Sequence, residues 1–336
     1  MQFSIFYHGF GVLASGNCTA VINPGIAAHS QQRYTWGMIL SASRRTDIPA
    51  FYGKWFLERQ KAGEVLVRNP LNPKMVSRIP LVPEHIDCIV FWTKNPIPIM
   101  CYLDEMESLG FSRYYFHITL TPYSSDLEPS IPPKNTLIDG FIRLSERIGK
   151  ERVIWRYDPI IITNRYSINF HIEQFYCYYE ALSNYTEKCV LSFVDSYTYL
   201  TSDFSQHGIT EIQSDTIATL ISGISAIVKS GAYPLALATC CETVDLSTYN
   251  VMRNRCIDGE LIQRLFGIPV SAKKDPAQRK TCLCAASRDI GAYNTCGYAC
   301  AYCYARRSKT SAASQDFASP LLGPPLDGTE RIHAVR

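Results

Sequence analysis

Residues 289–305 read Asp289-Ile290-Gly291-Ala292-Tyr293-Asn294-Thr295-Cys296-Gly297-Tyr298-Ala299-Cys300-Ala301-Tyr302-Cys303-Tyr304-Ala305. The stretch holds three cysteines with the spacing C-x3-C-x2-C, and an aromatic residue, Tyr302, precedes the third. Three thiolates from one short loop can bind three irons of a [4Fe-4S] cluster, which leaves the fourth iron open to a substrate or a cofactor. The pattern therefore indicates chemistry. A structural zinc site is the alternative, but zinc needs a fourth Cys or His that the loop itself does not supply.

The loop resembles the cluster-binding motif of the radical S-adenosylmethionine (radical SAM) superfamily. The resemblance implies a [4Fe-4S] cluster that binds S-adenosyl-L-methionine and cleaves it reductively to methionine and a 5'-deoxyadenosyl radical, which acts on a substrate. In most of that superfamily the motif lies near the N-terminus, whereas here it lies near the C-terminus. We therefore expect a permuted order of strands.

Short apolar stretches alternate with helical patterns from Met38 onward, which is typical of a parallel sheet covered by helices. The predicted strands are residues 38–43, 87–93, 114–121, 152–157, 189–194, 233–239 and 289–295. Helices are predicted over residues 49–62, with Asp47 as N-cap and Gly63 as stop, and over residues 211–229, which carry an apolar stripe. We predict an α/β fold, a complete or partial TIM-like (β/α) barrel with the cluster-bearing strand permuted to the C-terminus.

The residues that follow the predicted strands carry further motifs, in segments 41–49, 92–96, 117–122, 127–129 and 156–160. Their order resembles that of the spore photoproduct lyase-like branch of the radical SAM superfamily, with the cluster loop displaced to the end. The whole layout, including Gln278-Arg279 and Cys282-x-Cys284, is more similar still to a bacterial family known as a domain of unknown function. That resemblance implies no substrate.

Polar side chains at the carboxyl ends of the strands are the candidates for cofactor binding, because TIM-like barrels place their chemistry at that edge. They are Ser43, Arg44, Asp47, Lys94, Thr119, Arg156, Asp158, Asp195 and Tyr302. Many radical SAM proteins bind the methionine amine with a Gly-Gly-Glu stretch, which this chain lacks, so Ser43 and Asp47 are the expected substitutes. Arg156 has the fork geometry to hold a carboxylate, with an internal pair to Asp158 as the alternative. Thr119 and Asp195 are weaker candidates for contacts to a ribose.

Four more cysteines are predicted to lie near the cluster loop. Cys282 and Cys284 precede the loop, while Cys241 and Cys256 follow the sixth predicted strand. We predict that these four hold a second iron-sulfur cluster, with Cys240 competing with Cys241 as a ligand. A zinc site or buried free thiols are the alternatives.

Composition limits the other classes of function. The chain has 33 Lys and Arg against 30 Asp and Glu, for a net charge of +3, and it shows no basic stripe with interleaved aromatics, so nucleic-acid binding is not supported. No apolar run is long enough for a membrane span, and the first 32 residues contain no Lys or Arg, so we expect neither a membrane anchor nor a signal peptide. Thirteen cysteines, eight of them after Thr239, favour a cytoplasmic protein with metal-binding thiols.

We divide the chain into an irregular N-terminal extension (1–37), a barrel core (38–240), a cysteine-rich iron-sulfur segment that completes the barrel (241–305) and a flexible tail (306–336). The resemblance implies a radical SAM-type enzyme of unknown substrate, served by an electron donor such as ferredoxin or flavodoxin. One alternative is a non-catalytic zinc or iron-sulfur protein with a ligand- or partner-binding barrel. Another is an electron-transfer module with two clusters.

Overall fold

Eight parallel strands form the central sheet of the computed structural model, which describes residues 37–271, 273–308 and 316–335. The order of strands across the sheet is β10-β1-β4-β5-β6-β7-β8-β9. Their bounds are β1 Met38–Ala42, β4 Ile86–Thr93, β5 Tyr114–Thr119, β6 Val153–Ile160, β7 Lys188–Phe193, β8 Ala236–Thr239, β9 Val251–Arg253 and β10 Arg288–Asp289. The prediction of an α/β fold with a parallel sheet is confirmed, and β9 is the one strand of this sheet that the sequence did not reveal.

Helices alternate with these strands along the chain. They are α1 Ile48–Phe51, α2 Gly53–Ala62, α3 Ile97–Met100, α4 Leu103–Ser108, α5 Lys134–Ile148, α6 Ile168–Leu182, α7 Thr201–His207, α8 Ser214–Ser230 and α9 Gly259–Phe266, with short 3-10 turns at Pro83–His85, Lys150–Arg152, Thr198–Leu200 and Ser247–Tyr249. None of the helices in the described part of the chain combines the length and apolar character that a bilayer crossing requires.

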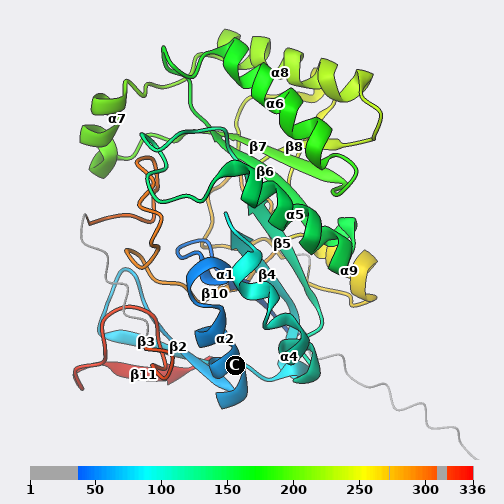
Figure 1. Ribbon diagram of the computed structural model, residues 1–336. Helices are drawn as coiled ribbons and strands as arrows, with labels where there is room; N and C mark the ends of the chain where they lie inside the picture. Colours follow the sequence, from blue (N-terminus) through cyan, green and yellow to red (C-terminus); the bar gives the residue numbers. More distant parts are fainter. Residues whose placement is uncertain (1–36, 272, 309–315, 336) are drawn as a thin grey trace, which may run out of the picture. The chain divides into compact units, whose positions relative to one another are not determined.

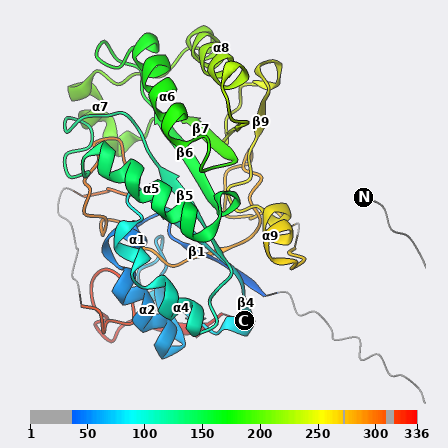
Figure 2. The ribbon, with the colours of Figure 1, turned by 45° about the vertical axis from the view of Figure 1, so that its right-hand side comes forward.

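The two faces of the sheet bury different partners, because successive side chains of a strand point to opposite sides. On β4, Ile89 and Phe91 belong to a large apolar core shared with helices α2, α5, α6 and α8. Cys88 and Val90 belong to a second core, which residues 256–285 cover. Figure 2 shows this arrangement, with α5 and α6 on one side of the strands and α9 on the other. The cysteine-rich segment thus lies on the face that most helices leave open.

The last strand of the sheet lies beside the first, as the predicted permutation requires. β10 pairs in parallel with β1, with Leu40 opposite Arg288 and Ser41 opposite Asp289. β10 is shorter than the predicted strand over residues 289–295, because the backbone N–H groups of Gly291 and Ala292 bond to side chains instead of to β1. The chain therefore leaves the sheet early and turns into the cysteine loop.

The predicted helix over residues 49–62 is interrupted at Tyr52, where the backbone leaves helical geometry between α1 and α2. The Tyr52 hydroxyl donates a hydrogen bond of 2.7 Å to the carbonyl of Thr295, and the Phe51 ring packs on Tyr298 with 4.6 Å between ring centroids. Both contacts reach the cysteine loop. The interruption therefore turns two aromatic side chains toward that loop, which helical periodicity alone does not predict.

A second sheet contains β2 Glu64–Arg68, β3 Met75–Pro80 and β11 Arg331–Ala334, in the order β11-β3-β2. The flexible tail predicted for 306–336 includes β11, which pairs in parallel with β3. Leu321 is buried against Leu66 and Val76, and the indole N–H of Trp55 donates to the carbonyl of Ser319. The predicted extension over residues 1–37 lies outside the described residues except for Gly37.

We predict that Leu321→Ala lowers the free energy of unfolding by about 2–4 kcal/mol, because it removes a buried side chain and leaves a cavity. Ile332→Ala is the matched control: Ile332 lies in β11 but is 43% exposed, so its change should be under about 0.5 kcal/mol. Urea denaturation measures both. Equal and negligible effects would mean that the C-terminal segment does not pack on β2 and β3.

Candidate functional site at the carboxyl edge of the sheet

The cysteine loop, residues 290–305, begins at the carboxyl end of β10. All eight strands are parallel, so this loop shares one edge of the sheet with the segments that follow β1, β4, β5 and β6. Asn294 and Ala299 have positive φ angles of 63° and 53°, which curl the loop back on itself. The backbone N–H of Asn294 donates to the carbonyl of Ala305, which closes the curl.

The loop encloses Cys296, Cys300 and Cys303 in one apolar cluster with aromatic side chains, among them Tyr123, Tyr298 and Tyr302. Cys300 is 5% exposed, and the other two cysteines are partly buried. Burial raises the pKa of all three thiols, to about 12 for Cys296. The aromatic surroundings shield the loop from water.

Backbone N–H groups near two of the thiols oppose the effect of burial on their pKa. Those of Tyr298 and Asp47 lower the pKa of Cys296, and those of Ala305 and Arg306 lower the pKa of Cys303, but burial outweighs them. Such donors stabilise a thiolate, and hydrogen bonds to sulfur also tune iron-sulfur clusters. The donor set and its surroundings therefore fit a thiolate-ligated cluster.

Within the described ranges, no group of three or more His, Cys, Asp or Glu side chains is arranged to hold a single metal ion as it stands. A zinc ion would need its ligands to converge on one point at about 2.3 Å from each sulfur. An iron-sulfur cube takes each thiolate at a different iron, so its ligands do not share one point.

A partly buried carboxylate, that of Asp289, joins the loop to the first strand. It accepts hydrogen bonds from the hydroxyls of Ser41 and Ser43, at 3.0 and 2.7 Å, and from the backbone N–H of Arg44 at 2.8 Å. The Arg45 guanidinium adds an ion pair at 3.0 Å. Burial alone would raise the pKa of Asp289, but Arg45 and the hydrogen bonds outweigh it and lower the pKa. The carboxylate is therefore charged at neutral pH.

Glu128 joins the loop to the middle of the sheet edge. Its side chain is fully buried and forms ion pairs with Lys94, at 2.7 Å, and Lys134, and it accepts hydrogen bonds from Thr121, at 2.7 Å, and from the Tyr302 hydroxyl. Burial raises its pKa, but the two lysines outweigh burial and lower it to about 2. Tyr302, which precedes the last cysteine, is thus fixed by a charged group.

Asp47 has the geometry of the predicted helix cap. Its side chain caps α1 by accepting from the N–H of Ala50 at 3.0 Å, and it also accepts from the N–H of Lys94 at 2.7 Å. Burial raises its pKa to about 6. Its charge raises the pKa of the Cys296 thiol further.

Arg156 and Asp158 form the internal pair that was the alternative to ligand binding. The second amino group of Arg156 lies 3.0 Å from the sulfur of Cys256, so its fork is already occupied. Arg44 is different: one amino group donates to Ser287 at 2.9 Å, its guanidinium lies over the Trp92 ring, and its Nε has no acceptor among the described residues. Of the two arginines, Arg44 retains a donor for a ligand.

The two remaining candidates for cofactor binding are Thr119 and Asp195. Thr119 ends β5 opposite Arg156 in the sheet register and is partly exposed. Asp195 forms an ion pair with Arg279 at 2.6 Å and accepts from the Tyr197 hydroxyl. Asp195 therefore contributes to a charged rim and not to the buried network.

The structure brings the four cysteines predicted as a second site together and adds Cys240 to them. All five belong to one cluster of buried and partly buried side chains, and the sulfurs of Cys240 and Cys256 lie 3.4 Å apart. We call this group the five-thiol ring. It packs against the face of the sheet that carries Cys88 and Val90.

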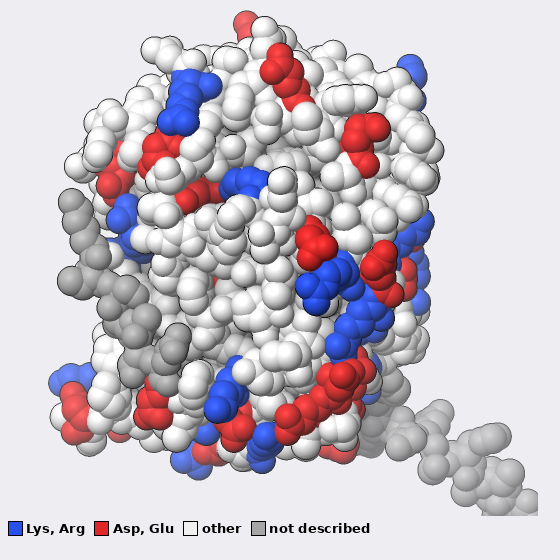
Figure 3. Space-filling model, in the orientation of Figure 1, with Lys and Arg blue, Asp and Glu red and all other residues white. Residues whose placement is uncertain are grey.

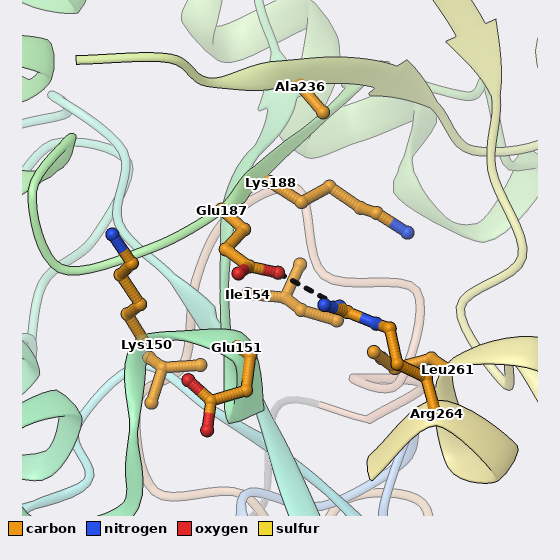
Figure 4. Close-up of a pocket in the computed structure, with 9 residues that line it drawn as sticks. Lys150, Glu151, Ile154, Glu187, Lys188, Ala236, Leu261 and Arg264 are labelled. Atoms are coloured by element: carbon orange, nitrogen blue, oxygen red, sulfur yellow. Dashed lines mark hydrogen bonds and ion pairs between the residues drawn. The ribbon is translucent and has the colours of Figure 1, made fainter.

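The structure contains two cavities of about 260 Å³, which lie at different edges of the central sheet. One is lined by residues 122–134, including Glu128 and Lys134, and so borders the loop's anchor. The other is lined by Val153, Lys188 and Ala236, which are the first residues of β6, β7 and β8. Arg264 also lines it and forms an ion pair with Glu187 at 2.9 Å (Figure 4). This cavity lies at the opposite edge of the sheet and has no part in the site.

Charge on the surface agrees with the small net charge of the chain. On the face in Figure 3, basic and acidic side chains are interspersed and do not gather into one basic patch. This face thus has no feature typical of a nucleic-acid interface.

Sequence reasoning did not assign the anchors of the loop. Asp289, Glu128 and Lys134 each make several contacts in the site, yet Asp289 was only the start of a strand and Glu128 only part of a motif. The sequence does contain a signal for Glu128. It is an acidic residue that follows the strand at 114–119 and directly precedes Pro129. Its partners, however, come from distant segments.

The comparison with protein families identifies the chain. The family model DUF1848, described as a domain of unknown function, matches residues 39–305. The chain belongs to the DUF1848 family. The DUF1848 match begins in β1 and ends at Ala305, so it includes the eight-stranded sheet, the five-thiol ring and the cysteine loop.

Other comparisons add little to the DUF1848 assignment. A search of curated proteins finds no match. A carboxyl transferase domain from Rhizobium etli pyruvate carboxylase, solved with pyruvate, is similar at 8% sequence identity and a TM-score of 0.23, over 70% of this chain and 44% of that one. This chain thus spans less than half the length of that structure, and the likeness is too low to carry an argument.

In this DUF1848 protein, we predict that Glu128→Gln lowers stability at pH 7 by about 3 kcal/mol, since it leaves two partly buried lysines without their anion. The pKa of Glu128 is about 2 in the fold against an ordinary 4.5. Its contribution is therefore full above pH 4.5 and is lost as the pH falls toward 2, by about 3 kcal/mol.

Urea denaturation between pH 6 and pH 2.5 checks this, with the exposed Glu146→Gln as the matched control. We expect the control to lose stability on acidification as the wild type does, and Glu128→Gln to lose less. An identical acid dependence in all three proteins would show that Glu128 is not the buried, paired anion of the site.

Proposed function

We propose that this chain is a radical SAM-type iron-sulfur enzyme, with Cys296, Cys300 and Cys303 as the ligands of a [4Fe-4S] cluster and an unidentified substrate. One observation carries the proposal: the three-cysteine loop begins at the carboxyl end of β10, beside β1, where its thiols lie among aromatic side chains. The strand order supports a permuted form of that architecture. We also infer a partial (β/α) barrel, since the N–H of Ala285 donates to the carbonyl of Ile257 and so links the segments after β9 and before β10.

When bound, the cluster would supply the electron that cleaves S-adenosylmethionine to methionine and a 5'-deoxyadenosyl radical. The chain's own part is to bind, orient and exclude water. Asp289 and Glu128 hold the two ends of the loop, through β1 and through Tyr302. Phe51 and Tyr298 cover it. Anchors of this kind hold a loop in one geometry, which an oriented reaction requires.

Two charged groups suit the amino-acid part of the cofactor. The Asp47 carboxylate is buried beside Cys296 and has a raised pKa, so a cationic amine there would restore its charge. Arg44 keeps an N–H without an acceptor among the described residues and can donate to a carboxylate. We therefore assign the amine to Asp47 and the carboxylate to Arg44, in preference to Arg156.

Lys94 has a positioning role in this proposal. Burial would lower its pKa, but Glu128 and Cys300 outweigh burial and raise it, so the ammonium stays charged. A fixed positive charge beside the loop offsets the negative charge of cluster thiolates. An electron donor such as ferredoxin or flavodoxin would serve the enzyme as its reductant.

The test is anaerobic reconstitution with iron and sulfide, followed by addition of dithionite and S-adenosylmethionine. We predict that the wild type binds about four or more irons per chain and forms 5'-deoxyadenosine, whereas the triple variant Cys296→Ala, Cys300→Ala, Cys303→Ala forms none. Cys101→Ala, Cys177→Ala is the matched control, because both thiols are exposed and lie outside the site.

Zinc in place of iron would contradict the proposal and support a non-catalytic metal protein. Iron without cleavage of S-adenosylmethionine would contradict it as well, and it would support an electron-transfer module.

A further inference from the structure

The five-thiol ring gathers cysteines from three separate segments. Cys240 and Cys241 follow β8, Cys256 follows β9, and Cys282 and Cys284 precede β10. The sulfurs of Cys240 and Cys256 lie 3.4 Å apart. Cys256, Cys282 and Cys284 are all buried, at 3–4% exposure. Free cysteines are often buried as small apolar residues, but five in one cluster are a set of potential ligands.

The backbone is shaped to bring both adjacent cysteines into the ring. Successive side chains at the end of a strand normally point to opposite faces. Cys241 has a φ of 61°, a conformation that residues other than glycine rarely adopt, and this breaks the alternation after Cys240. Backbone strain of this kind is characteristic of functional sites.

Polar donors surround the sulfurs of the ring. Arg156 Nη1 lies 3.0 Å and Asn254 Nδ2 3.1 Å from the sulfur of Cys256, and the N–H of Ile257 donates to the sulfur of Cys284 at 3.4 Å. A neutral thiol needs no guanidinium beside it, whereas a metal-bound thiolate is stabilised by one. These donors give the ring the surroundings of a ligand set.

We propose that the five-thiol ring binds a second iron-sulfur cluster, with Cys256, Cys282, Cys284 and one of the adjacent pair Cys240 and Cys241 as its four ligands. This site does not depend on the proposed function of the cysteine loop. Four thiolates leave no iron open, so the cluster takes no substrate and is distinct in kind from the cluster of the loop.

Zinc is the alternative occupant, because tetrahedral zinc also takes four sulfurs, each about 2.3 Å from one point. Metal analysis of the reconstituted protein distinguishes the two.

The position of the ring gives the cluster a structural consequence. The ring joins the segment after β9 to the segment before β10, next to the hydrogen bond from Ala285 to Ile257. The cysteine loop follows β10 directly. A cluster in the ring would therefore fasten the start of the loop segment to the opposite end of the sheet.

The test compares iron, sulfide and zinc contents of anaerobically reconstituted variants. The loop variant (C296A, C300A, C303A) should keep about two to four irons per chain, with an absorption and electron paramagnetic resonance spectrum that S-adenosylmethionine does not change. The ring variant (C256A, C282A, C284A) should lose those irons. C101A, C177A is again the control.

The adjacent pair provides a milder variant that retains the fold. Cys240→Ser and Cys241→Ser should each keep the second cluster, and the double variant should lose it while circular dichroism stays unchanged. Absence of iron from the loop variant, full iron in the ring variant or in the double variant, zinc in the ring, or a disulfide between Cys240 and Cys256 in the anaerobic protein would each overturn the proposal. If only the function of the cysteine loop is wrong, the loop variant holds as much iron as the wild type.

Discussion

The carboxylate of Asp289 is the contact on which the site depends. It lies in a two-residue strand near the C-terminal end of the chain, and it is bound by two serines, a backbone N–H and an arginine from residues 41–45. β10 is too short for its own ladder to hold it, so this cluster of hydrogen bonds fixes its register on β1. Gly291 follows so closely that a Cβ there would lie 2.0 Å from the hydroxyl oxygen of Ser43.

The cysteine loop at the carboxyl edge of the sheet starts from this anchor. The loop that leaves β10 needs a second attachment, and the buried Glu128 supplies it through Tyr302 while two lysines balance its charge. Between the two carboxylates lie the three thiols of the loop. Hydrogen bonds to these two carboxylates fix the loop in position. Aromatic side chains around the thiols protect them from water.

The sequence predicted the parallel α/β sheet well, because apolar strands such as residues 87–93 have a local pattern that burial on both faces produces. It also predicted the strand that leads into the cysteine loop, which is β10 beside β1. It missed the partners of Asp289 and Glu128, since these are contacts between segments far apart in the chain. It placed residues 316–335 in a flexible tail because one buried leucine and a four-residue strand, β11, leave almost no periodic signal.

The most direct measurement is the anomalous scattering of iron in crystals grown anaerobically from the reconstituted protein. The account predicts a peak of iron density within bonding distance of Cys296, Cys300 and Cys303 at the carboxyl edge of the sheet. Density at the zinc edge, or iron elsewhere with these three thiols unbound, would contradict the assignment of the loop as the centre of the site.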